Sequence, residues 1–165
     1  MTEAYPLAWP QGWPRTPPAA QTDGRSHFGK MRQSENGSWK SKKPLTFAEA
    51  RDGLIAAVAK VGGTQLVLST NFQISASTGL PRGDRKRPDD EGVALYFRRK
   101  GVDMVFARDA YQRAEENMRS LALALEAMAQ LERHGGAGLA GRAFQGFAAL
   151  PAPKKPHEIL GLREH

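Results

Sequence analysis

Basic and aromatic side chains are interleaved in the first 43 residues of the chain, a pattern that suits contact with a polyanion. Lysine and arginine neutralise phosphates and release counterions, while an aromatic ring can stack on a base without reading its edge. We therefore predict a surface that binds DNA or RNA weakly and without sequence preference. The residues predicted to form it are Arg15, Arg25, Lys30, Arg32, Trp39, Lys40, Lys42 and Lys43.

The distribution of charge agrees with this prediction. Residues 1–45 carry seven Lys or Arg against three acids, whereas the remaining 120 residues carry seventeen bases and fourteen acids. A basic arm ahead of a nearly neutral domain can contact polyanions, but such charge can also serve only to keep a tail soluble. The sequence leaves both interpretations open.

Two tryptophans near the start have two possible uses. Trp9 and Trp13 each precede a proline, which favours an extended backbone at the tryptophan. They are either anchors in an apolar groove of the domain or exposed rings that stack on bases, and the sequence does not decide between these. Residues 17–43, rich in Ser, Gly, Lys and Arg, are expected to be flexible.

A charged cluster at residues 84–91 raises the possibility of a metal-dependent nuclease. Such a site needs carboxylates around Mg²⁺ and a lysine near the attacking water. No acid-x-Lys pattern falls on a predicted strand, so we interpret the cluster as a solvated loop. The candidates near strands are Asp89, Asp90, Asp103 and Lys100.

Other catalytic chemistry has no support in the sequence. Cysteine is absent, which excludes disulfides and a thiol nucleophile, and the four histidines are dispersed along the chain. The glycines form neither a phosphate-binding loop nor a dinucleotide fingerprint, and no serine has a Gly-x-Ser-x-Gly setting. We predict no catalytic residue, no metal ligand and no cofactor.

The elements that must carry these residues begin with a helix at about 46–61. Thr46 and Glu49 have the spacing of a capping box, and Leu45 stands where a hydrophobic staple would lie. Apolar residues then follow at helical spacing until Gly62-Gly63 ends the helix. A β-rich run at 65–69 comes next.

A hairpin at 93–107 is the clearest local prediction. Lys100-Gly101 is a plausible two-residue turn, and it fixes a register in which Arg98 faces Asp103 and Phe97 faces Met104. A long helix at about 112–133 follows with one apolar stripe, and a shorter helix comes after it.

Together these elements predict an α+β fold. A small antiparallel sheet with the central hairpin 93–107 should pack against the helices at about 46–61 and 112–133. We expect a basic, Trp- and Pro-rich arm at 1–44, a domain at 45–151 and a C-terminal tail at 152–165.

Several segments, taken together, resemble a family of small bacterial and prophage proteins often labelled J-domain-containing. They are Tyr5-Pro6-Leu7 with Trp9-Pro10, Gly12-Trp13-Pro14-Arg15-Thr16, Leu80-Pro81-Arg82 with Asp90, Gly92-Val93-Ala94-Leu95-Tyr96-Phe97, Asn117, Arg142-Ala143-Phe144 with Gly146-Phe147, and Ala149-Leu150-Pro151.

The end of the chain bears on what this resemblance implies. Longer members carry a J domain after the Ala-Leu-Pro segment, and residues 157–162 resemble its opening. A J domain stimulates its chaperone partner through a His-Pro-Asp loop, which this sequence lacks. The resemblance thus implies, as an alternative to nucleic-acid binding, a protein-interaction adaptor without co-chaperone activity.

The chain shows no sign of a membrane partner. No run of residues approaches the roughly 18 to 20 consecutive apolar residues of a membrane span. The N-terminus also lacks the charged-then-apolar order of a signal peptide. We expect a cytoplasmic protein.

Overall fold

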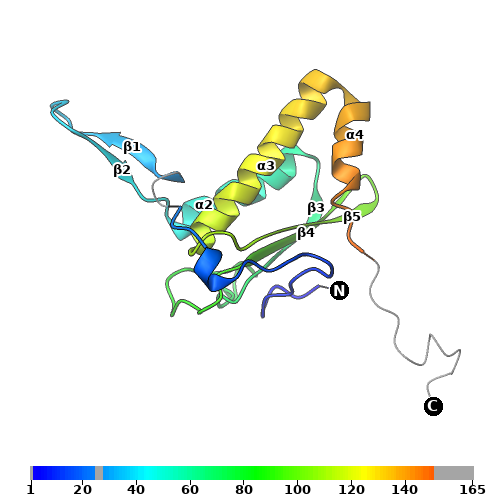
Figure 1. Cartoon of the computed structure of the whole chain (residues 1–165), viewed down its shortest axis with the longest axis horizontal. Helices are drawn as coiled ribbons and strands as arrows, with labels where there is room; N and C mark the ends of the chain where they lie inside the picture. The colour runs from blue at the N-terminus through cyan, green and yellow to red at the C-terminus, as the bar shows by residue number, and fades with distance from the viewer. Residues whose placement is uncertain (1, 25–27, 151–165) are drawn as a thin grey trace, which may run out of the picture.

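The computed structural model describes residues 2–24 and 28–150 and confirms the predicted α+β class, with two small antiparallel sheets and helices (Figure 1). In chain order the elements are the 3-10 turn η1 (Pro18–Ala20), β1 (Lys30–Gln33), β2 (Lys40–Lys43), α2 (Phe47–Lys60), β3 (Thr64–Ser69), β4 (Val93–Arg99), β5 (Val102–Arg108), α3 (Ala114–Gly135) and α4 (Ala137–Gln145).

The larger sheet has the strand order β3-β4-β5, and the β4–β5 pair has the predicted register. Arg98 lies opposite Asp103, as expected from the turn. Lys100 has a φ of 50° and Gly101 a φ of 78°, the two positive values that a type I′ turn requires. This turn matches the twist of the strands and thereby fixes which side chains face the core.

Helices α2 and α3 pack against each other and cover one face of the three-stranded sheet (Figure 1). The apolar stripe predicted on the long helix is buried from Ala114 to Met128, as are Phe47, Ala50, Leu54, Ala57 and Val58 of α2. Each large side chain in this core contributes about 1.5–3 kcal/mol by leaving water. The main contributors are Leu54, Val58, Leu95, Phe97, Phe106, Met118, Leu121 and Leu125.

The capping box at the start of α2 is confirmed. The Thr46 side chain accepts from the Glu49 backbone N–H at 3.2 Å, and the Glu49 carboxylate accepts from the Thr46 N–H at 3.0 Å. Hydrogen bonds from the Thr46 backbone and hydroxyl, and from Lys30, lower the pKa of Glu49 to about 2. The carboxylate therefore stays ionised and continues to accept the hydrogen bond from the Thr46 N–H at the start of α2.

Residues 2–24 lie along the domain, which differs from the separate arm expected up to residue 44. The Tyr96 hydroxyl donates to the Ala8 carbonyl at 2.6 Å, and the Ala8 N–H donates to the Ser69 hydroxyl at 2.8 Å. Partial burial raises the pKa of Tyr96. Further along, Thr22 forms a parallel bridge with Tyr111. The sheet holds this segment through hydrogen bonds that composition alone does not reveal.

Trp9 and Trp13 are anchors in this packing, which answers the question left open by the sequence. The Trp9 indole N–H donates to the Trp13 carbonyl at 2.9 Å. The Trp13 ring lies 6.3 Å from that of Phe147, and the Arg15 guanidinium lies 4.3 Å above the Trp9 ring. Both rings are partly buried.

Helix α4 closes one end of the core. Ala140 and Phe144 are buried, whereas Leu139 is exposed. After α4 the chain pairs with the edge of β5, where the Val105 N–H donates to the Phe147 carbonyl at 2.9 Å. Residues 147–149 thus extend the sheet along the edge of β5.

Candidate nucleic-acid interface

Strands β1 and β2 form a two-stranded hairpin that projects away from the helices and the larger sheet (Figure 1). Its pairing is Lys30 with Lys43, Met31 with Lys42, Arg32 with Ser41 and Gln33 with Lys40. All eight strand residues are exposed to solvent. Residues 30–43, which fall in the segment 17–43 expected to be flexible, thus form two paired strands.

The tip of the hairpin is closed by short-range hydrogen bonds. The Ser34 N–H donates to the Trp39 carbonyl at 3.0 Å, and the Gly37 N–H donates to the Ser34 carbonyl at 2.9 Å. The Asn36 carboxamide oxygen accepts from the hydroxyls of Ser34 and Ser38 at 2.7 and 2.8 Å. The turn holds Trp39 beside the tip with 55% of its surface exposed.

Pairing decides how the side chains are distributed. Paired residues of an antiparallel ribbon share a face, and successive residues point to opposite faces. One face therefore carries Lys30, Arg32, Ser41 and Lys43, and the other carries Met31, Gln33, Lys40 and Lys42. Between residues 30 and 43 there are five basic residues and one acid, so both faces are basic.

The base of the hairpin meets the start of α2. The Lys30 ammonium lies 3.3 Å from the Glu49 carboxylate, in a position where both side chains are exposed. An exposed pair of this kind contributes little to stability, so Lys30 can exchange this partner for a phosphate at little cost.

Six of the eight residues predicted to bind nucleic acid lie in this hairpin, and two do not. Arg15 instead donates to Asp90 at 2.6 Å and to the buried carboxylate of Asp109 at 2.9 Å. Its charge is thus paired with two aspartates, while its side chain stays 41% exposed. Arg25 and the tail at 152–165 lie outside the described residues.

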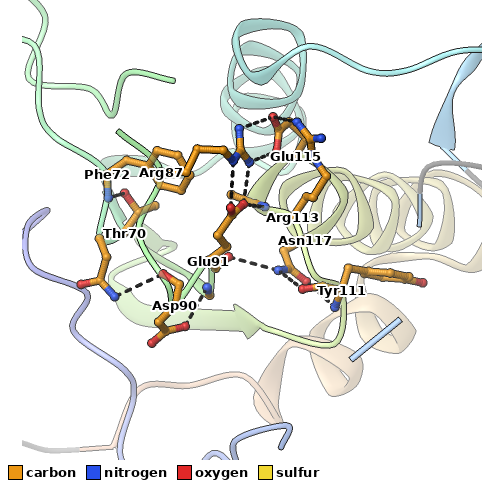
Figure 2. Close-up of polar contacts among 12 residues, drawn as sticks. Thr70, Phe72, Arg87, Asp90, Glu91, Tyr111, Arg113, Glu115 and Asn117 are labelled. Atoms are coloured by element: carbon orange, nitrogen blue, oxygen red, sulfur yellow. Dashed lines mark hydrogen bonds and ion pairs between the residues drawn. The ribbon is translucent and has the colours of Figure 1, made fainter. Parts of the chain in front are cut away.

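The most connected polar network of the domain surrounds Arg87 (Figure 2). Arg87 was assigned to a solvated loop, but its guanidinium bridges Glu91 and Glu115, lying 2.7 Å from a Glu115 oxygen. Burial alone would raise the pKa of Glu115, but hydrogen bonds from Arg87 and Arg113 hold it below its usual range. The expectation of a solvated loop is therefore wrong for Arg87 and Glu91.

This network caps the N-terminus of α3. Arg113, at the N-cap, makes no capping bond, and the Glu91 carboxylate instead accepts from the Ala114 N–H at 2.7 Å. The buried Asn117 side chain donates to the carbonyls of Glu91 and Tyr111 and accepts from the Tyr111 N–H (Figure 2). The network's polar groups are paired with one another, so it joins a loop to a helix and leaves no group aimed at a ligand.

The acids considered for a nuclease site are held in separate places. Asp90 pairs with Arg15, Asp103 lies 3.6 Å from Arg98, and Lys100 lies 3.4 Å from Glu132. Within residues 2–24 and 28–150, no three His, Asp or Glu side chains gather in a way that could hold a metal ion.

A second surface feature is an open cleft with a volume of about 970 Å³ on the sheet face opposite the helices. Trp9, Trp13 and Tyr96 line it, together with Arg98 and Asp103, which form an ion pair with each other. The cleft is aromatic and nearly neutral, whereas the hairpin is basic and fully exposed. The two features would select different partners.

Comparison of the chain with protein-family models, curated proteins and solved structures finds no match in any of the three. Among the described residues, no helix has the length and apolar character needed to cross a membrane.

Proposed function

We propose that this protein binds nucleic acid through the β1–β2 hairpin without reading its sequence. The observation that supports the proposal is a projecting ribbon with five basic residues, one acid and an exposed Trp39. The ribbon buries no side chain of its own strands, so packing does not account for its composition. Phosphate contacts would account for it.

The absence of sequence preference follows from the types of side chain. Four of the five cations are lysines, which act as point charges on phosphates, and only Arg32 has the fork that reads guanine edges. Trp39 adds stacking or apolar contact, which every base tolerates. We therefore expect weak binding with little discrimination between sequences.

Salt dependence tests the proposal directly. If all five cations contact phosphates, the logarithm of the affinity should fall with the logarithm of salt at a slope of about −3.5 for single strands or −4.5 for duplex DNA. Fluorescence anisotropy with a labelled oligonucleotide between roughly 50 and 200 mM salt measures this slope. A signal that does not depend on salt would contradict the proposal.

A matched pair of triple variants locates the contacts. Replacing Lys40, Lys42 and Lys43 with Gln should flatten the slope by about 2 to 3. Replacing the exposed Lys60, Lys86 and Arg133 with Gln removes the same charge elsewhere and should change the slope by less than about 1. Equal effects of the two variants would mean that net charge, and not the hairpin, drives binding.

The aromatic cleft supports a second candidate, a protein-interaction adaptor of the kind that the J-domain-containing resemblance implies. Three aromatic rings on an open sheet face suit an apolar or proline-containing partner segment. This candidate predicts no salt-dependent binding to any oligonucleotide. It also predicts a partner that survives nuclease treatment and is lost when Tyr96 is replaced by Ala.

A further inference from the structure

The basic residues of the hairpin are divided between its two faces. Lys30, Arg32 and Lys43 lie on one face, and Lys40 and Lys42 lie on the other. A single strand stretched along a ribbon meets one face, so it would leave the cations of the other face without phosphates. A ligand that presents phosphates on both sides of the ribbon would use all five cations.

We propose that the hairpin enters the major groove of B-form DNA with one face toward each sugar-phosphate backbone. This inference rests on the proposed function and names its ligand as duplex DNA. A strand layer with side chains on both faces is about 10 Å thick. The major groove is about 12 Å wide and admits a two-stranded ribbon, whereas the minor groove is only about 6 Å wide.

The reach of the hairpin also fits this ligand. The chain from Lys30 to the turn at Asn36 spans about 20 Å in extended form, more than the groove depth of about 8.5 Å, so the hairpin would lie obliquely along the groove, with the cations of its base still beside the backbones. Because the hairpin stands clear of the helices and sheet, the duplex can approach without meeting them (Figure 1). Trp39, beside the tip, would then lie at the base edges, where thymine methyl groups offer apolar contact.

The same geometry separates DNA from RNA. The major groove of A-form RNA is deep and narrow, so a ribbon with side chains on both faces cannot enter it. The hairpin would meet only the outer phosphates of an RNA duplex. Duplex DNA should therefore bind more tightly than either duplex RNA or single strands of the same length.

Anisotropy titrations with the full chain and four labelled 20-mer probes test this inference at about 100 mM salt. The probes are duplex DNA, one of its single strands, the matching RNA duplex, and the same DNA duplex with glucosylated hydroxymethylcytosines that fill the major groove. We expect affinity for unmodified duplex DNA to exceed that for each other probe by about tenfold. Single-strand or RNA binding as tight as duplex binding, or no effect of glucosylation, would overturn the inference.

Two double variants test the use of both faces. Lys40→Gln with Lys42→Gln removes two charges from one face, and Lys30→Gln with Lys43→Gln removes two from the other. Both variants should weaken duplex binding by a similar factor, on the order of tenfold at low salt. A variant that binds duplex DNA like the unmodified protein would show that only one face is used and would overturn the two-face geometry.

The outcomes also separate this inference from the function on which it rests. Tighter binding to single strands than to duplex DNA would contradict the major-groove geometry but not nucleic-acid binding itself. Failure to bind any of the four probes would contradict both the geometry and the proposed function. Circular dichroism and thermal melting of each variant confirm that a loss of affinity does not come from unfolding.

Discussion

Residues 2–24 and residues 30–43 both contain tryptophan and arginine but have opposite roles in the structure. The first segment carries one base, Arg15, against two acids, whereas the second carries five bases against one acid. In the first, Trp9 and Trp13 are packed and Arg15 is paired with two aspartates. In the second, every strand residue is exposed, and Trp39 has more than half of its surface in solvent.

The difference comes from the partners that the rest of the chain provides. Arg15 forms ion pairs with Asp90 and Asp109, and the two indole rings lie against the outer face of the sheet. At the base of the hairpin, Lys30 forms an ion pair with Glu49, while the strand side chains stay exposed. Tryptophan and basic residues therefore mark a candidate ligand surface only where the fold leaves them exposed.

Removing residues 1–16 should produce the largest effect. The deletion exposes the sheet face under Trp9 and Trp13 and strips Asp109 of its partner, so the free energy of unfolding should fall by about 2 to 4 kcal/mol. Urea denaturation of the shortened and full chains measures this.

The matched change replaces residues 30–43 with a short Gly-Ser linker. This segment buries no strand residue, so the free energy of unfolding should change by less than about 1 kcal/mol while nucleic-acid binding is lost. If the linker variant proved as unstable as the N-terminal deletion, the contrast between the two segments would be wrong.

Two turn glycines allow the same contrast at single positions. Gly101 has a φ of 78° in the hairpin that carries the core, so Gly101→Val should cost about 2 kcal/mol of stability. Gly37 has a φ of 70° at the exposed tip, and Gly37→Val should weaken DNA binding while changing global stability by less than about 0.5 kcal/mol. Thermal melting and anisotropy distinguish them. A Gly101→Val protein that melts like the unmodified chain would contradict the importance of this turn.

A third comparison uses single substitutions of Arg15 and Lys40. Arg15→Gln leaves the buried Asp109 with a weaker partner, so unfolding should become easier by about 1 to 2 kcal/mol. Its affinity for DNA should stay within about twofold of the unmodified protein. Lys40→Gln should do the reverse, weakening binding without a change in stability. A large loss of DNA affinity in Arg15→Gln would return Arg15 to the binding surface.

The smallest expected effect on stability is at Glu116, which lies beside the end of the N-terminal segment 2–24. Glu116 is buried against Gly24, and one of its carboxylate oxygens has no hydrogen-bond partner among the described residues. Burial raises the pKa of Glu116. Glu115 and Asp23 raise this pKa slightly further, and Arg113 lowers it slightly. Glu116→Gln should therefore stabilise the fold by about 1 kcal/mol at neutral pH.

The sign of its pH dependence follows from the raised pKa. The protonated Glu116 is favoured by the fold, so its contribution to stability is present below its unfolded pKa and is lost as pH rises through its folded pKa. The advantage of the Gln variant should thus shrink in acid. Urea midpoints of both proteins at neutral and acidic pH measure this, and a constant difference would contradict it.

Local signals in the sequence predicted much of the fold. The capping box of Thr46 and Glu49 and the Lys100-Gly101 turn are short-range features whose geometry depends on few neighbours, and both are confirmed. The shorter helix after α3 was predicted as well, but the burial of Ala140 and Phe144 beside an exposed Leu139 depends on how α4 packs against α3.

The candidate site was predicted only in part. Lys30, Arg32, Trp39 and the lysines after it were found by composition, but their hairpin was missed because its strands lack the apolar alternation that marks a half-buried strand. Asn36-Gly37 was an available signal for a hairpin tip. The pairing of Arg15 with Asp90 and Asp109, by contrast, joins residues far apart in the sequence and could not be predicted from local pattern.

Amide hydrogen exchange of the full chain, with and without a DNA duplex, tests the central claim in one measurement. The account predicts that peptides from residues 2–24 are already protected in the free protein and do not change when DNA is added. Peptides from residues 30–43 should exchange quickly when free and become slower with DNA. Protection that appears at residues 2–24 on adding DNA, or no change at residues 30–43, would contradict the division of the two segments into an anchor and a binding hairpin.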